Sequence, residues 1–209
     1  MMTFLYIAAA VTAYLVAGWN PAITFSKAVY RKDIRTLGSG NPGFTNFKRN
    51  FGNLAWLILV LDLSKGAAVV ALFAVLFGRE AGLYELGAVY TGLFAVLGHS
   101  FPVWYGFKGG KGFLVGLSTL WVADWRVGGI ATLIMIVLLL TTKYMSLSTV
   151  TALVSAVLLF ALFGAEAEVI IIWAVTALFV LWRHRVNFRR LFAGKESKFS
   201  IGSRKHKAD

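Results

Sequence analysis

The chain of 209 residues is 58% hydrophobic and only 14% charged, with a net charge of +12 and no cysteine. Soluble domains contain roughly 45–50% apolar and about 25% charged residues, so this composition indicates an integral membrane protein of one domain. The lack of cysteine excludes disulfides, thiolate metal sites and a cysteine nucleophile, and His99, His184 and His206 are too dispersed to predict a metal site. Lys and Arg accumulate in the cytoplasmic loops of multispanning proteins, so the positive charge does not lead us to expect a nucleic-acid partner.

Seven hydrophobic segments approach the length of about 20 residues that a transmembrane helix needs. They lie at 3–25, 54–77, 83–99, 113–123, 127–142, 147–164 and 168–183. The first is predicted to be a transmembrane helix and not a cleaved signal peptide, because no basic segment precedes it. The fourth is short and contains Gly116, so we expect it to be tilted, broken or partly re-entrant, with six spans as the alternative count.

Charge alternates between the connections of these spans. Basic residues are concentrated after spans one, three, five and seven, whereas the opposite connections are more acidic (Arg79 and Arg126 against Glu80, Asp124, Glu166 and Glu168). The fold class expected is therefore an all-α polytopic membrane protein of about seven transmembrane helices, with its N-terminus outside and its C-terminus in the cytoplasm. Residues 1–196 are expected to form one transmembrane domain, followed by a basic, disordered cytoplasmic tail at 197–209.

Two glycine-rich loops lie on the predicted cytoplasmic side. The first is Gly-Ser-Gly-Asn-Pro-Gly-Phe-Thr-Asn at 38–46, and the second is Phe-Lys-Gly-Gly-Lys-Gly at 107–112, shortly after His99. Glycine lets backbone N–H groups approach a ligand closely, and the neighbouring hydroxyl, amide and ammonium groups supply hydrogen bonds and positive charge. The loops therefore predict a site for a phosphorylated small molecule at a membrane surface.

Three motifs together resemble one family. The segment 33–46 resembles the first motif of the bacterial acyl-phosphate:glycerol-3-phosphate acyltransferases, 98–112 resembles the second, and 183–196 the third. They occur in the family's order and spacing, on one predicted membrane face. Phe44 stands where alanine is usual, and Trp19-Asn20 replaces a small pair before Pro21, and both departures bear on the acyl-chain preference.

The resemblance implies an enzyme without a cofactor that transfers a fatty acyl group from acyl phosphate to the 1-hydroxyl of glycerol 3-phosphate. The products would be lysophosphatidic acid and phosphate, at the first step of phospholipid synthesis. It also implies a multi-pass protein of the bacterial inner membrane, surrounded by membrane lipids, with an active site facing the cytoplasm. A functional hand-over from the enzyme that produces acyl phosphate would follow.

The same resemblance assigns roles to residues of this chain. His99, Ser39 and Asn187 are expected to be catalytic. His99 is expected to hydrogen-bond the carbonyl or the phosphate. The base that accepts the hydroxyl proton is either His99 or the substrate's own phosphate. The substrate-binding residues are expected to be Gly40, Asn41, Thr45, Asn46, Arg49, Lys65, Lys108, Lys111, Ser146, Ser148 and His184.

Other interpretations of the same residues stay open. Asp62 and Lys65 lie three residues apart inside a span, so Lys65 could form a structural ion pair or face the substrate. A transporter for a phosphorylated solute is an alternative function, although no internal repeat is evident. An acyltransferase with a His-x4-Asp pair is excluded, because Trp104 and Arg189 stand at that spacing from His99 and His184.

Overall fold

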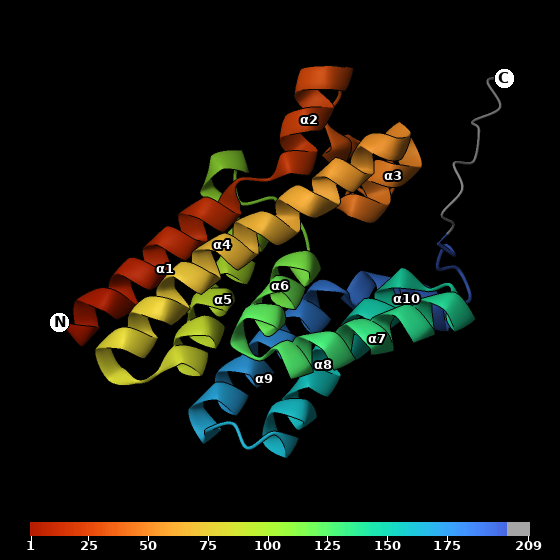
Figure 1. Ribbon diagram of the computed structural model, residues 1–209. Coiled ribbons are helices and arrows are strands. Elements are labelled where there is room, and N and C mark those ends of the chain that lie inside the picture. The colour runs from red at the N-terminus through yellow and green to blue at the C-terminus, as the bar shows by residue number, and fades with distance from the viewer. Residues whose placement is uncertain (200–209) are drawn as a thin grey trace, which may run out of the picture.

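The computed structural model describes residues 1–199, which form ten α-helices (Figure 1). The helices are α1 (Met2–Gly18), α2 (Pro21–Tyr30), α3 (Phe44–Phe51), α4 (Ala55–Ala81), α5 (Tyr84–Ser100), α6 (Phe113–Ala123), α7 (Trp125–Thr142), α8 (Met145–Leu162), α9 (Ala167–Arg183) and α10 (Arg185–Phe192). Three single turns of 3-10 helix, at Ile34–Thr36, Gly52–Leu54 and Val103–Tyr105, lie in the connections. The part of the chain described contains no strand, so the predicted all-α class is confirmed.

Five helical segments are long and apolar enough to cross a membrane, and α9 with α10 makes a sixth if their 57° bend is counted within one span. The predicted fourth span coincides with α6, which has only 11 residues. At 1.5 Å per residue α6 is roughly 16 Å long, about half the thickness of the hydrocarbon core. The count of seven spans and the orientation of the termini stay predictions.

The first predicted span, 3–25, is wrong in one respect, because two helices share it. Asn20 ends the run by accepting a hydrogen bond from the N–H of Ile23 at 3.0 Å, and Pro21 occupies the first position of α2. A side-chain cap followed by proline starts a new helix even where hydrophobicity continues. Asn20 also donates to the carbonyl of Pro42 at 3.1 Å, so the junction is tied to the first glycine-rich loop.

The core lies between α1, α4, α5, α6, α8 and α9. Close helix contacts depend on glycine: a Cβ at Gly98 would lie 2.2 Å from the carbonyl oxygen of Tyr14, and one at Gly92 would lie 2.2 Å from Thr119. Small residues let transmembrane helices approach this closely. The result is a tight bundle around α5, which carries His99 at its end.

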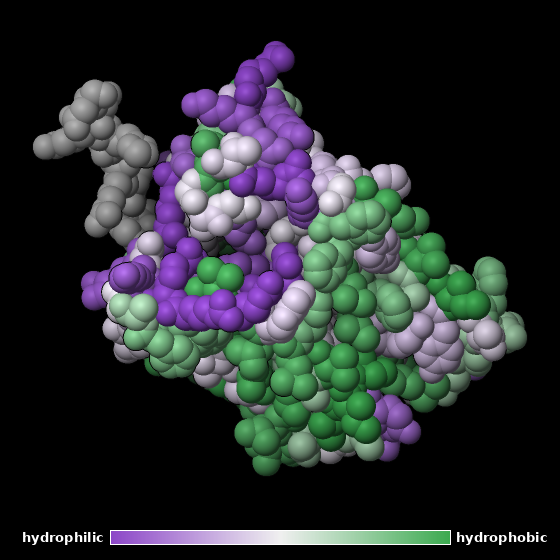
Figure 2. Space-filling model, turned by 180° about the vertical axis from the view of Figure 1, so that it is seen from behind, coloured by the Kyte–Doolittle hydropathy of each residue, from purple (hydrophilic) through white to green (hydrophobic). Residues whose placement is uncertain are grey.

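Hydrophilic residues gather mainly at one end of the molecule, around α2 and α10, and apolar side chains cover most of the rest of the visible face (Figure 2). A second, smaller core beneath this end packs α2 and α3 against the start of α4. The described part of the predicted tail reaches back to the bundle, since the N–H of Phe199 donates to the carbonyl of Lys143 at 2.7 Å. Residues 200–209 of that tail lie outside the described residues.

Candidate active site

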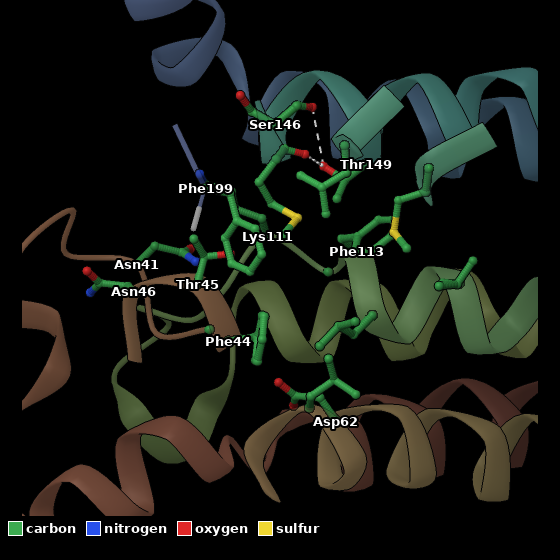
Figure 3. Close-up of a pocket in the computed structure, with 18 of the residues that line it drawn as sticks. Asn41, Phe44, Thr45, Asn46, Asp62, Lys111, Phe113, Ser146, Thr149 and Phe199 are labelled. Atoms are coloured by element: carbon green, nitrogen blue, oxygen red, sulfur yellow. Dashed lines mark hydrogen bonds between the residues drawn. The ribbon is translucent and has the colours of Figure 1, made fainter. Parts of the chain in front are cut away.

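A cavity of about 1090 Å³ opens beneath the hydrophilic end of the bundle. Its polar part is lined by the loop 38–46, Lys111 and the segment from His184 to Phe199, and its apolar part by α4, α6 and α7. Figure 3 shows Asn41, Thr45 and Lys111 facing this space, with the rings of Phe44 and Phe113 nearby. One cavity thus offers hydrogen-bond donors and positive charge at one end and hydrocarbon at the other.

Asn46 organises the first glycine-rich loop. Its Oδ1 accepts hydrogen bonds from the N–H of Ser39 at 3.1 Å and from Asn50 at 3.2 Å, while its Nδ2 donates to the carbonyls of Ile34 and Leu37. The side chain is 2% exposed. Because both ends of its amide are occupied within the protein, Asn46 holds the loop in shape, where the sequence predicted a direct contact with phosphate.

The curled loop depends on Gly38. Its φ of +54° is one that glycine adopts readily, and a Cβ there would lie 2.5 Å from the Oδ1 of Asn46. The loop leads into α3, whose first turn contains Thr45 and points its N-terminus at the cavity side of the loop. The free N–H groups of a first helical turn favour an anion.

The second glycine-rich loop is attached to the end of α5. The N–H groups of Gly109 and Gly110 donate to the carbonyls of Ser100 and His99, and Arg183 donates to the carbonyl of Gly110 at 2.8 Å. A Cβ on Gly110 would lie 2.2 Å from the Nε2 of His99, so only glycine leaves room for the ring. These contacts direct Lys111 into the cavity.

Lys111 belongs to a hydrogen-bond network that joins the second and third motifs. It donates to the Oδ1 of Asn187, whose Nδ2 donates to Glu196 at 2.7 Å. Ser146 and Arg190 also donate to the carboxylate of Glu196, at 3.1 and 3.0 Å. Burial lowers the pKa of Lys111 to about 8, against the opposing effect of Glu196, so this ammonium group is charged at neutral pH.

His99 lies 4% exposed in the cavity wall, with Lys65 behind it. The Nζ of Lys65 lies 3.1 Å from the Nδ1 of His99 and 2.8 Å from the Oδ1 of Asp62, and it donates to the carbonyl of Trp19 at 2.6 Å. Lys65 was expected either to form a structural ion pair or to face the substrate, and in the structure it forms the ion pair with Asp62. Lys65 itself does not line the cavity, although Asp62 does.

His184 lies at the junction of α9 and α10, where a backbone carbonyl fixes the position of its ring hydrogen. Its Nδ1 lies 2.8 Å from the carbonyl oxygen of Val180, which can only accept, so Nδ1 carries the hydrogen. The neutral ring then has its lone pair on Nε2. His184 is 5% exposed and lines the cavity, so this nitrogen can accept a hydrogen bond from a ligand hydroxyl.

The structure brings most of the predicted site residues to the one cavity. The residues that line it are Ser39, Asn41, Thr45, Asn46, Arg49, His99, Lys111, Ser146, His184 and Asn187. Ser148, in contrast, is buried in α8 and donates to the carbonyl of Tyr144 at 2.9 Å, which leaves Ser146 as the serine that reaches the site.

Gly40 and Lys108 depart from the prediction, because they line a separate hollow of about 550 Å³. The guanidinium of Arg35 occupies its wall and joins the two loops, donating to both oxygens of Asp33 and, at 2.8 Å, to the carbonyl of Tyr105. The hydrogen bonds from Arg35 hold the pKa of Asp33 well below its usual value. Arg35 thus hydrogen-bonds groups of the protein here, and of the two predicted loop lysines only Lys111 lines the main cavity.

Sequence reasoning gave no role to Glu196, Arg190 or Arg183. Glu196 was part of the third motif, but nothing in its spacing indicates that the chain turns back to set it against Ser146, 50 residues earlier. Arg183 donates to the carbonyls of the second glycine-rich loop, a contact that no spacing along the chain indicates. Both contacts depend on how α8, α9 and α10 pack.

The apolar part of the cavity lies beside the short helix α6. Leu114, Leu117 and Trp121 of α6 line it together with Met135 and Leu139 of α7. Trp121 donates to the Oγ1 of Thr132 at 3.0 Å and lies against Gly128, where a Cβ would be 2.7 Å away. Trp56, Trp121 and Leu140 line the cavity and are also exposed, at 45%, 48% and 67%, so this end is open toward the lipid-facing surface.

Comparison with known proteins agrees with this geometry. Residues 7–194 match the family model described as glycerol-3-phosphate acyltransferase. Glycerol-3-phosphate acyltransferases of Francisella philomiragia and Thermoanaerobacter sp. are 37% and 36% identical, covering 94% and 90% of this chain and 94% and 93% of their own. The crystal structure of PlsY, an integral membrane glycerol 3-phosphate acyltransferase, in its glycerol 3-phosphate form has a TM-score of 0.86 at 32% identity, covering 93% of this chain and 96% of PlsY. The chain therefore belongs to the glycerol-3-phosphate acyltransferase family of integral membrane proteins.

Proposed function

We propose that this acyltransferase takes its acyl group from acyl phosphate and transfers it to the 1-hydroxyl of glycerol 3-phosphate, releasing lysophosphatidic acid and inorganic phosphate. The observation that carries the proposal is the two-sided cavity, with Ser39, Thr45 and Lys111 at its polar end and α6 and α7 at its apolar end. A phosphate group beside a hydrocarbon chain matches both halves. PlsY, whose structures include glycerol 3-phosphate and lysophosphatidic acid forms, supports the same pair of ligands.

The chemistry of a mixed anhydride suits this chain. The substrate hydroxyl oxygen attacks the acyl carbon, and the bond from that carbon to the phosphate oxygen breaks. Inorganic phosphate leaves with the bonding electrons, and in the overall balance it takes up the proton that the hydroxyl loses. Phosphate is a good leaving group, so no acyl-enzyme is required of a chain that lacks cysteine. The protein's contribution is to hold two anions at reacting distance and to stabilise the charge that develops between them.

The polar groups divide by the direction of their hydrogen bonds. Arg49 and Lys111 offer positive charge, and the hydroxyls of Ser39 and Thr45 face the cavity from the first loop. The Nε2 lone pair of His184 and the carboxylate of Glu196 are acceptors in the cavity lining that suit a glycerol hydroxyl. This combination accommodates a phosphate and a polyol together, which is what the proposed acceptor substrate contains.

The apolar end supports a lipid-soluble donor. It is open toward the lipid-facing surface beside α6, so an acyl chain would enter from the bilayer without passing through water. The active site would face the cytoplasm of the bacterial inner membrane, because the loops that form it carry the excess of Lys and Arg. A reporter fused after α4 and another fused after α7 would lie on opposite sides under this orientation.

The test of the function is an assay on purified protein in detergent. It receives glycerol 3-phosphate with palmitoyl phosphate, palmitoyl-CoA or palmitoyl-carrier protein, and both lysophosphatidic acid and the released group are measured. Product and inorganic phosphate from palmitoyl phosphate alone are the expected result. Product from either thioester at a comparable rate would refute the proposed donor, and product from none, in folded protein, would favour the transporter hypothesis and an uptake assay in liposomes.

A further inference from the structure

Lys65 forms an ion pair with Asp62 and contacts two further acceptors. The Oδ1 of Asp62, the carbonyl of Trp19 and the Nδ1 of His99 lie 2.8, 2.6 and 3.1 Å from its Nζ. Lys65 and Asp62 are 7% and 1% exposed, and an ionised lysine in such a position is stable beside a carboxylate. An ammonium group has three donors and no lone pair, so Lys65 is the donor in its hydrogen bonds to Trp19 and His99.

This arrangement determines where His99 carries its hydrogen. Since Lys65 donates to Nδ1, that nitrogen holds the lone pair, and the neutral ring must be protonated on Nε2. No hydrogen bond within residues 1–199 uses Nε2, and the ring forms part of the cavity wall beside Gly110. His99 therefore presents an N–H donor at the cavity and has no lone pair there to accept a proton.

Asp62 alone would impose the opposite tautomer. Its Oδ1 lies 3.6 Å from Nδ1, and a carboxylate beside a histidine normally accepts the Nδ1 hydrogen and leaves Nε2 as the basic nitrogen. The ammonium group of Lys65 contacts both partners and takes the place of that hydrogen. As a consequence His99, although it lies next to an aspartate, cannot act as a general base through Nε2.

We propose that Lys65 is a positioning residue that holds His99 as the Nε2–H tautomer, so that His99 donates a hydrogen bond to an oxygen of the acyl donor and does not accept the hydroxyl proton. The meaning of that donor for catalysis rests on the proposed function. On that function the acceptor is the carbonyl oxygen or a phosphate oxygen of acyl phosphate, where negative charge increases in the transition state. His184, with its lone pair on Nε2, provides the opposite tautomer across the same cavity.

The tautomers can be read directly by nitrogen-15 NMR of histidine-labelled protein, in a His206→Gln background so that two histidines remain. His99 is expected to show a proton on Nε2 and none on Nδ1, and His184 the reverse. In Lys65→Met, the His99 hydrogen is expected to move to Nδ1, toward Asp62, while the His184 signals stay unchanged. A proton on Nδ1 of His99 in the parent protein, or an unchanged tautomer in folded Lys65→Met, would overturn the proposal.

Activity supplies a separate readout. Lys65→Met is expected to lower kcat about a hundredfold, as removal of a transition-state donor does, with the KM for glycerol 3-phosphate within about threefold. The exposed Lys32→Met is the matched control. Asp62→Asn/Lys65→Met removes both charges, and its kcat should stay low; recovery there would mean that an unpaired Asp62, not the tautomer of His99, caused the loss. The NMR result stands even if the assay with palmitoyl phosphate fails, so the two proposals can fail independently.

Discussion

The amide of Asn187 donates from Nδ2 to Glu196 Oε1 at 2.7 Å, while its Oδ1 accepts from Lys111. Asn187 thereby lies between a cation and an anion that would otherwise pair directly with one another. Glu196 orients the amide, and the amide in turn directs the ammonium group toward the cavity. This relationship makes the third motif a support for the second.

Asn187→Ala should therefore damage the site through Lys111. Without Oδ1, the lysine is free to turn toward Glu196, which neutralises the charge expected to bind phosphate. Loss of a buried hydrogen-bond partner costs roughly 1–3 kcal/mol, so we expect kcat/KM to fall about tenfold to a hundredfold. Asn53→Ala, a change at the same end of the molecule but outside the cavity, is the control. Equal kinetics for the two variants would contradict the network.

Gly38 tests the first loop. Alanine at this φ of +54° costs about 1–2 kcal/mol, and its Cβ would also collide with Asn46. Gly164 has a φ of +77° with nothing within 4 Å, so Gly164→Ala carries the backbone cost without the collision. We expect both variants to lower the thermal midpoint in detergent, but only Gly38→Ala to lose more than about tenfold in kcat/KM. Matched losses in both would mean that the loop shape is not what the activity needs.

Hydrophobic length predicted the helices well, because α4, α5 and α7 to α9 are long apolar runs bounded by charge or glycine. It could not place the break at Asn20, where Pro21-Ala-Ile continues the apolar pattern and only the side-chain cap ends the helix. It did indicate that the fourth span, now seen as α6, is short. The helices themselves could therefore be predicted from hydrophobic length. The boundary between α1 and α2 could not, because it depends on the side-chain cap of Asn20.

The motifs predicted most of the residues that meet at the cavity, but not how each would be used. Lys108 and Lys111 are three residues apart in one loop, and the hydrogen bonds of Gly109 and Gly110 to α5 decide that only Lys111 enters the cavity. Asn46 likewise looked like a ligand, and its partners Ile34 and Leu37 lie in a segment whose fold the sequence did not reveal. Such assignments depend on tertiary contacts that spacing along the chain does not contain.

The apolar end of the cavity can be filled without touching the polar end. Leu139→Trp on α7 would place a bulky indole ring where the proposed acyl chain lies, whereas Leu133→Trp lies on the exposed side of the same helix. Leu139→Trp should raise the KM for palmitoyl phosphate about tenfold and leave the KM for glycerol 3-phosphate within about twofold, because the interaction lost is with the acyl chain. If Leu133→Trp has the same effect, or both substrates are affected equally, the acyl chain does not occupy this end.

Lys111 predicts how substrate binding changes with pH. Burial lowers its pKa to about 8, so the charged form that attracts phosphate predominates below that pH and is lost as the pH rises through it. The KM for glycerol 3-phosphate should therefore be lowest near neutral pH and increase above about 8. Lys111→Arg keeps its charge throughout this range, since arginine is protonated at every pH used, and should give a flat profile if its guanidinium reaches the phosphate. Lys32→Arg, at an exposed position, should keep the parent profile. A parent-like increase in Lys111→Arg would assign the titration to another group, and a flat profile in the parent would mean that the charge on Lys111 does not contribute to binding.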